Sequence, residues 1–189
     1  MLRIALFGGT FDPIHDAHLE VAREAARQFA LDRVVFIPAS RPPHKHGVTR
    51  TPYEHRYRMV ELACRDDELF EPSRLEEGIA NSYSIETIER VRATLEPGDR
   101  LYFLIGSDAF AEIRTWHRWG EVIQSVDFIV ASRPGCAFDV PEGARVERLE
   151  RVDLPVSSSE IRKRLAAGDE RVDVPPAVMA YIREHGLYR

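Results

Sequence analysis

The stretch from residue 2 to residue 18 constrains the fold more than any other part of the sequence, because three local signals meet in it. Leu2 to Phe7 is an almost unbroken apolar run, typical of a buried parallel strand, and the pair Gly8 and Gly9 ends it. We expect this run to be the first and central strand of a sheet. Apolar residues then recur at spacings of three and four, which predicts a helix with Asp16 as its N-cap.

The turn after this strand has the features of a phosphate site. Gly8 and Gly9 can take backbone angles denied to other residues and let a ligand approach the main chain closely. His15 and His18 fall just before and just inside the predicted helix start. The positive end of the helix dipole disfavours a histidine cation there, and a bound anion would remove that cost. The strand, the glycine turn and the helix start therefore together predict a phosphate site.

Two structural alternatives compete with a phosphate site at this turn. One is a bare strand-to-helix connection, and the other is a metal site half built by the H-x-x-H pair, for which only Asp12 and Asp16 could supply a third ligand. The dinucleotide fingerprint G-x-G-x-x-G and the Walker pattern ending in Gly-Lys-Ser/Thr are both absent. A phosphate site here is therefore of another kind.

Short apolar strands that alternate with helices predict an α/β fold, a doubly wound and mainly parallel sheet of the Rossmann-like type in three layers. We expect one domain over residues 1–189. The further strands are expected at 34–37, 70–73, 101–105, 128–131, 146–149 and 152–154. Helix starts are expected at three capping residues: Thr51 and Ser157, each in a capping box, and Ser84.

The composition excludes several classes of function. A net charge of -5 argues against a general binder of nucleic acid or of an anionic membrane. No apolar segment reaches the length of a membrane span, and we expect no targeting leader. Cys64 and Cys136 lie far apart and form no C-x-x-C motif, so we expect a cytoplasmic, reduced protein. A homo-oligomer is a further possibility that the sequence does not decide.

Ligands of an open α/β sheet bind beyond the carboxyl ends of its strands, and polar residues follow several of the predicted strands. Residues 39–52 form a basic loop without an acidic residue, and Asp108 follows the strand 101–105. Asp108 either caps the next helix or binds ribose hydroxyls. For the other candidates, an ordinary position at the surface or in the core remains an alternative to a role in binding. These candidates are Trp116, His117, Arg133 and the basic residues of the loop.

Two motifs about 140 residues apart match known signatures. The string GGTFDPIH at 8–15 is followed by a second histidine at 18, and VSSSEIR occupies 156–162. The first resembles the opening of the nicotinate-nucleotide adenylyltransferase family, whose superfamily has the signature T/H-x-G-H, and the second is similar to that superfamily's ISSTxIR motif. The resemblance covers the whole chain, with further segments RPPHK (41–45), SYS (82–84), IGSDAF (105–110), TWHRW (115–119) and SRPG (132–135).

The resemblance implies transfer of an adenylyl group from ATP to nicotinate mononucleotide, with Mg²⁺ on the phosphates and with deamido-NAD and pyrophosphate as products. It implies four catalytic residues: His15, His18, Lys45 and Arg162. It implies an ATP site formed by Gly8, Gly9, Thr10, Phe11, His15, His18, Gly106, Asp108, Ser132, Arg133, Ser157, Ser158 and Arg162. It implies acceptor contacts from Lys45, Ser84, Trp116 and His117.

This sequence departs from the family pattern at two positions. Ala17 stands where the signature usually has Gly, and we expect its methyl group to restrict the approach of the nucleotide. Ser159 replaces the more usual Thr. Two related activities are the nearest alternatives, the adenylylation of phosphopantetheine and of nicotinamide mononucleotide. An alternative of another class is a nucleotide-binding regulator without transferase activity.

Overall fold

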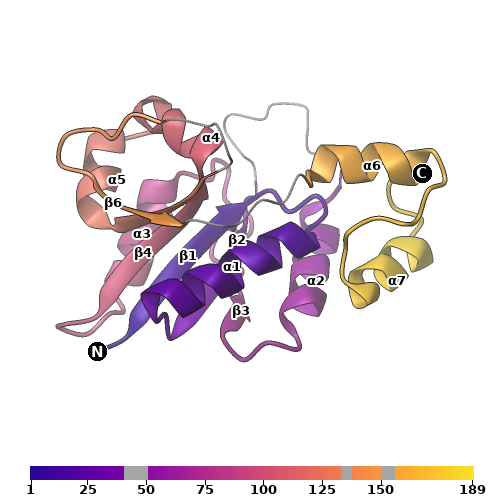
Figure 1. Ribbon diagram of the computed structural model, residues 1–189, viewed down its shortest axis with the longest axis horizontal. Helices are drawn as coiled ribbons and strands as arrows, with labels where there is room; N and C mark the ends of the chain where they lie inside the picture. The colour runs from indigo at the N-terminus through magenta and orange to yellow at the C-terminus, as the bar shows by residue number, and fades with distance from the viewer. Residues whose placement is uncertain (41–50, 133–137, 150–155) are drawn as a thin grey trace.

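The computed structural model describes residues 1–40, 51–132, 138–149 and 156–189. Six parallel strands form one sheet in the order β3-β2-β1-β4-β5-β6, with helices on both faces (Figure 1). This is the Rossmann-like, three-layer α/β fold expected from the sequence. The strands are β1 (Arg3–Gly9), β2 (Arg33–Pro38), β3 (Phe70–Pro72), β4 (Arg100–Gly106), β5 (Asp127–Ala131) and β6 (Arg145–Leu149).

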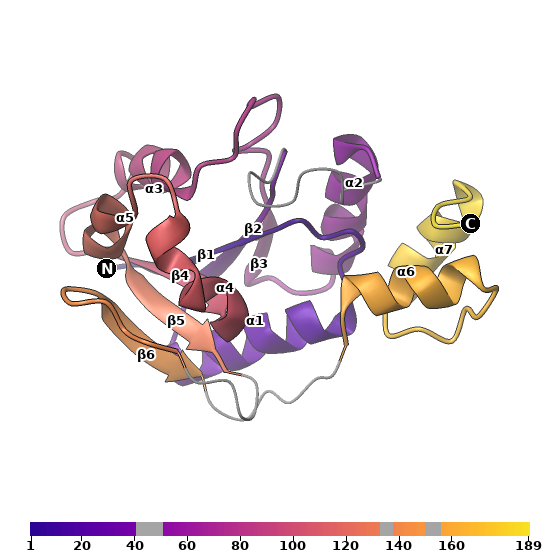
Figure 2. The same cartoon turned by 90° about the horizontal axis from the view of Figure 1, so that it is seen from above.

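The helices divide between the two faces of the sheet, and Figure 2 shows α1 and α3 on opposite sides of the strands. Helices α1, α2, α6 and α7 contribute to one hydrophobic core, and α3, α4, α5 and the 3-10 turn η1 contribute to the other. Their bounds are α1 (Asp16–Phe29), α2 (Tyr53–Cys64), α3 (Ser84–Arg92), α4 (Ser107–Ala111), η1 (Ile113–Thr115), α5 (Trp119–Ser125), α6 (Ser158–Ala166) and α7 (Pro176–Glu184).

The central strands bury side chains on both faces. In β1, Ala5 and Phe7 enter the core beneath α1, whereas Ile4 and Leu6 enter the core beneath α3. Successive side chains of a strand point to opposite faces, so a strand covered on both sides must be apolar at nearly every position. This requirement explains why the sequence of β1 shows a continuous apolar run and no alternation.

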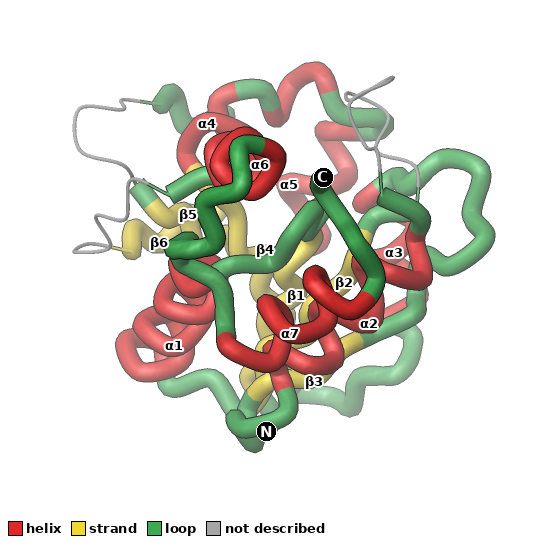
Figure 3. The backbone as a smooth tube through the Cα atoms, turned by 90° about the vertical axis from the view of Figure 1, so that its right-hand side faces the viewer, coloured by secondary structure: helices red, strands yellow, loops and turns green. Residues whose placement is uncertain are grey.

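The order of the strands reverses beside β1. From β1 the chain runs outward to β2 and β3, then returns to place β4 on the other side of β1. The chain therefore leaves β1 and β4 in opposite directions at their carboxyl ends, which is where ligands of such sheets bind. Figure 3 views the molecule from the side on which α6 and α7 lie.

Three expected helix starts differ in detail from the structure. The N-cap of α1 is His15 and not Asp16, because His15 keeps the extended backbone (φ -145°, ψ 169°) that precedes a helix. Tyr83, also extended, is the N-cap of α3, so Ser84 is its first helical residue. The capping box predicted at Thr51 is wrong, since Pro52 precedes α2 without a side-chain cap.

The capping serine of α6 is confirmed, because the Ser157 hydroxyl accepts a hydrogen bond from the Glu160 N–H at 3.2 Å. The expected strand 152–154 lies outside the described residues. Among the helices of the described part of the chain, none combines the length and the apolar composition that crossing a membrane requires.

Candidate active site

The loop from Gly9 to His15 forms the centre of the site and is shaped by one buried ring. Phe11 is 2% exposed and takes a left-handed backbone conformation, φ +48°. A Cβ atom built on Gly9 would lie 2.9 Å from Cζ of this ring, closer than real contacts allow. Glycine is therefore required at position 9, because the Phe11 ring fills the space that any other side chain would occupy. The ring itself packs against Phe7 and Phe36 in the core.

His15 and His18 interact directly at the start of α1. The backbone N–H of His15 donates to Nδ1 of His18 at 3.2 Å, and the two rings stack with their centroids 3.7 Å apart. A ring nitrogen that accepts a hydrogen bond carries no proton, so the neutral His18 imidazole bears its proton on Nε2. Edges of Phe7 and Phe11 also contact the half-buried His18 ring. The first motif thus holds His18 as a fixed hydrogen-bond donor.

The second motif lies against the same loop, as the pairing of the two signatures in the sequence suggests. Nη1 of Arg162 donates to the carbonyl oxygen of Asp12 at 2.7 Å, and Nη2 donates to Oγ of Ser159 at 3.2 Å. The Ser158 hydroxyl donates to the carbonyl oxygen of Pro13 at 3.0 Å. The first turn of α6 is therefore bound to the loop between β1 and α1, 150 residues earlier in the sequence.

Sequence reasoning missed Arg56, a buried cation that joins the ends of two strands. Its Nη1 atom donates to the carbonyl oxygens of Thr10 and Ala39, both at 2.8 Å, and its Nε atom donates to that of Thr51 at 3.1 Å. Arg56 is 1% exposed, and burial lowers the pKa of its guanidinium. These bonds fix the loops after β1 and β2 relative to each other.

The sequence does contain a signal for this residue. Arg56, Val60 and Ala63 follow one another at spacings of four and three, so the arginine lies on the apolar stripe of α2. A charged residue at an inward position of a helix is rarely buried without partners. This pattern distinguishes Arg56 from the exposed Arg58 on the same helix.

The residues expected to contact the acceptor are gathered around the start of α3. Ser84 is half-buried in the first turn, and the preceding Tyr83 ring stacks on His117 with centroids 4.3 Å apart. Trp116 is half-buried, packs against the core and meets Phe103 edge-on at 5.8 Å. The backbone N–H of Ser40, after β2, donates to Oγ of Ser82 at 2.9 Å, so this region adjoins the loop after β2.

The ends of β4 and β5 carry further predicted residues. Gly106 is the N-cap of α4 and is exposed, and Asp108 is exposed in the first turn of that helix. The alternative in which Asp108 caps α4 is therefore wrong, because Gly106 has the extended backbone before the helix. Ser132 follows β5, and its hydroxyl meets no hydrogen-bond partner within the described ranges. Lys45 and Arg133 lie outside the described residues.

The structure does not support the metal alternative for the H-x-x-H pair. The part of the chain that is described contains no group of three or more His, Cys, Asp or Glu side chains placed to hold a metal ion. His15 and His18 stack on each other, and Nδ1 of His18 is occupied by a backbone donor.

Comparison with known families defines the class of this fold and site. A family model described as cytidylyltransferase-like matches residues 6–164, so the chain is a nucleotidyltransferase of the cytidylyltransferase-like family. A probable nicotinate-nucleotide adenylyltransferase of Solibacter usitatus is 63% identical over 187 residues, which covers 99% of this chain and 100% of the relative. Another, from Thermus thermophilus, is 42% identical over 190 residues and covers 100% of both chains. Within the class, this chain belongs to the nicotinate-nucleotide adenylyltransferases.

Solved structures share the fold at low sequence identity. Plasmodium falciparum nicotinic acid mononucleotide adenylyltransferase, complexed with NaAD, superposes with a TM-score of 0.80 at 20% identity, over 100% of this chain and 98% of the other. A putative nicotinate-nucleotide adenylyltransferase from Vibrio parahaemolyticus gives 0.72 at 21% identity, over 100% and 96%. At these identities the likeness extends to the fold alone.

Proposed function

We propose that the protein transfers the adenylyl group of ATP to nicotinate mononucleotide, a step of NAD biosynthesis that forms deamido-NAD and pyrophosphate. One observation carries this proposal: the fixed donor His18 and the cation Arg162 belong to separate signatures, and both are bound to the loop between Gly9 and His15. The relatives' names and the NaAD complex of the Plasmodium protein support the choice of acceptor. Residues 1–189 act as a single nucleotidyltransferase domain in this proposal.

The acceptor's own phosphate is the nucleophile. Its second pKa lies near 6, so it is largely dianionic at neutral pH and no proton must be removed before it attacks. It forms a bond to the α-phosphorus of ATP, and the bond from that phosphorus to the oxygen bridging to the β-phosphate breaks. The electron pair leaves with pyrophosphate. The protein therefore needs positioned donors and cations, and it needs no general base.

The roles of the residues follow from this chemistry. His18 donates from Nε2 to the oxygens on which negative charge grows, and Arg162 and Lys45 balance the charge of the triphosphate. His15 orients His18 through its backbone N–H. The nucleotide is also held by the ends of β1, β4 and β5 and by the start of α6, through Gly8, Gly9, Thr10, Phe11, Gly106, Asp108, Ser132, Arg133, Ser157 and Ser158. Ser84, Trp116 and His117 hold the nicotinate end of the acceptor.

Mg²⁺ enters with ATP in this proposal. Phosphate oxygens and water would bind the ion, because Mg²⁺ usually keeps several waters and takes few protein ligands. When bound, it neutralises part of the triphosphate charge. No protein side chain is assigned as its ligand.

The test is an incubation of the purified protein with ATP, Mg²⁺ and one acceptor at a time: nicotinate mononucleotide, nicotinamide mononucleotide or phosphopantetheine. Released pyrophosphate and the mass of the product are measured. We expect the highest kcat/KM with nicotinate mononucleotide. Faster transfer to another acceptor would change the assigned substrate, and tight ATP binding without any transfer would indicate a regulator.

A further inference from the structure

We propose that Tyr188 is a positioning residue, which holds Asp12 and through it the loop that receives the phosphates of ATP. The Tyr188 hydroxyl donates to Oδ1 of Asp12 at 2.7 Å, across 176 positions of sequence. Asp12 is 1% exposed and belongs to the loop between β1 and α1. The inference rests on the proposed function for its catalytic consequence, and the contact itself is independent of that function.

The end of α7 explains how Tyr188 reaches the loop. Gly186 takes a left-handed conformation, φ +60°, and its N–H donates to the carbonyl oxygen of Arg183 at 3.2 Å. The Leu187 N–H donates to the carbonyl oxygen of Ile182 at 3.0 Å. These two bonds form a Schellman motif, which reverses the chain at a glycine after a helix. Leu187 and Tyr188 are thereby directed back onto the core shared with α1 and α2.

Tyr188 is held in an unfavourable backbone conformation at the point of contact. Its φ is +64°, a left-handed value that residues with a Cβ rarely adopt and that persists where the surroundings impose it. Burial and the nearby charge of Asp12 raise the pKa of the Tyr188 hydroxyl, so it stays protonated and able to donate throughout the physiological range. A hydroxyl donor to a carboxylate is among the stronger neutral-to-charged hydrogen bonds.

Asp12 connects this contact to the phosphate-binding residues. Its side chain accepts from Tyr188, and its main-chain carbonyl accepts from Nη1 of Arg162 at 2.7 Å. The next carbonyl oxygen, that of Pro13, accepts from the Ser158 hydroxyl. A rotation of Asp12 would move the carbonyl that orients Arg162, so fixing the carboxylate also fixes the guanidinium. Tyr188 thus acts on the site through Asp12 and has no contact with the reacting atoms in this proposal.

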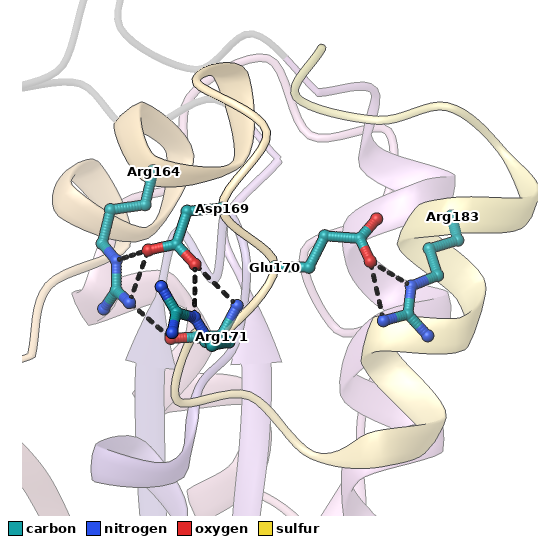
Figure 4. A network of polar contacts seen from close by, with 5 residues as sticks. All are labelled: Arg164, Asp169, Glu170, Arg171 and Arg183. Carbon is teal, nitrogen blue, oxygen red and sulfur yellow. Dashed lines mark hydrogen bonds and ion pairs between the residues drawn. The ribbon is translucent and has the colours of Figure 1, made fainter.

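Hydrogen bonds and ion pairs connect the segment between α6 and α7 to both helices (Figure 4). Asp169 accepts from Arg164 at 2.8 Å and from the backbone N–H of Arg171 at 3.0 Å, and Arg183 of α7 pairs with Glu170 at 2.8 Å. Partly exposed pairs of this kind contribute little stability one by one. Together they connect the segment between α6 and α7 to both helices, which restricts the position of α7 relative to the loop from Gly9 to His15, called the phosphate loop below.

The experiment compares two variants of the same helix-end region, Tyr188→Phe and Tyr181→Phe. Each removes one hydroxyl, but the Tyr181 hydroxyl bonds to Nδ1 of His55 at 2.9 Å, between α7 and α2, and not to Asp12. We expect Tyr188→Phe to lower kcat/KM for ATP about tenfold, to leave the KM for nicotinate mononucleotide within twofold, and to melt within a few degrees of Tyr181→Phe. We expect Tyr181→Phe to keep kcat/KM within twofold. Equal activity of the two variants would overturn the proposal, as would a loss confined to the melting temperature.

A second measurement separates this proposal from the proposed function. Binding of a non-hydrolysable ATP analogue is measured for the wild type and for both tyrosine variants. We expect the dissociation constant to rise at least threefold in Tyr188→Phe and to stay unchanged in Tyr181→Phe, whichever acceptor the enzyme uses. Wild-type protein that fails to make deamido-NAD refutes the function alone, whereas identical dissociation constants in the two variants refute the role of Tyr188.

The double variant tests the route of the effect. In an Asp12→Ala background the Tyr188 hydroxyl has lost its acceptor at position 12, and we expect the further change Tyr188→Phe to lower kcat/KM for ATP less than threefold. A full tenfold loss in that background would show that Tyr188 acts without Asp12.

Discussion

The backbone N–H of His15 lies 3.2 Å from Nδ1 of His18 and donates to it. Protonation of that nitrogen would replace an acceptor with a donor and break the bond. The contact therefore favours the neutral imidazole with its proton on Nε2. A neutral donor at a helix start also avoids the repulsion between an imidazolium and the positive end of the helix dipole.

We predict that His18→Ala lowers kcat by a factor of about a hundred or more while the fold survives. The expected loss is that of one preorganised donor in a transition state, and it should exceed the loss in ATP affinity. Steady-state kinetics and analogue binding measure the two effects. His55→Ala is the matched control, because His55 is a half-buried histidine that contacts Tyr181 and not the phosphate loop. Near-normal turnover in folded His18→Ala would remove His18 from the mechanism.

We predict a kcat/KM for nicotinate mononucleotide well above ten times that for nicotinamide mononucleotide. Backbone N–H groups of the first turn of α3, beside Ser84, suit a carboxylate, whereas the amide would direct its own donors toward them. Each factor of ten corresponds to about 1.4 kcal/mol.

Trp116→Ala tests where this preference originates. Its ring packs edge-on against Phe103 and is expected to contact both pyridine rings alike. The variant should lose activity on both acceptors and keep most of the ratio. Collapse of the ratio would assign the preference to Trp116, and equal use of both acceptors by the wild type would refute the specificity.

We predict that Arg56→Met lowers the free energy of unfolding by about 3 kcal/mol or more, because carbonyl oxygens that Arg56 bonds at the ends of β1 and β2 would lose their donors. Urea unfolding measures the change. Arg58→Met on the same helix is the control and should alter stability by less than about 0.5 kcal/mol, since Arg58 is exposed and pairs with Glu61 at the surface. Similar losses in the two variants would contradict the role of Arg56.

We predict that Glu76→Gln stabilises the protein at pH 7 and not at pH 4. Burial raises the pKa of Glu76 above its ordinary value of 4.5, although hydroxyl groups of Ser82 and Thr87 oppose the shift. When the pKa of a carboxyl group is higher in the folded than in the unfolded protein, the protonated group stabilises the fold at a pH below its unfolded-state pKa. This stabilisation is lost as the pH rises through the folded-state pKa.

The glutamine amide of the Glu76→Gln variant does not ionise, so the variant does not lose stability as the pH rises to 7. The melting temperature of Glu76→Gln should therefore exceed that of the wild type at pH 7 and not at pH 4. Glu77→Gln, at an exposed neighbour, should not show the pH-dependent difference. A Glu76→Gln protein that is less stable than the wild type at pH 7 would show that the carboxylate is favoured there.

We predict that Ala17→Gly tightens ATP binding with little change in kcat. Ala17 is 7% exposed in the first turn of α1, directly beside His18. Glycine in a helix disfavours folding by up to about 1 kcal/mol, which a melting curve would register. Weaker binding of an ATP analogue by a folded Ala17→Gly variant would show that the methyl group fits the site.

The sequence predicted the sheet well because buried parallel strands appear as continuous apolar runs, as in β1 and β4. The predicted N-caps Asp16 and Ser84 are each one residue too late. The N-caps are His15 and Tyr83, which have the extended backbone of a cap but not the serine or aspartate side chain that the prediction relied on. Arg56 was missed because arginine is usually at the surface, and its bonds are to main-chain atoms that carry no signal of residue type. The roles of Lys45 and Arg133 stay predictions.

The contact between Asp12 and Tyr188 also orders events during synthesis. A ribosome adds Asp12 early and Tyr188 176 positions later, a delay on the order of ten seconds or more at typical elongation rates. The nascent chain can pair β1 with β2 and β4 within that interval, since those strands emerge first. Its phosphate loop is locked only after α7 has been made. The strands that carry the site are thus synthesised long before the residue that holds Asp12.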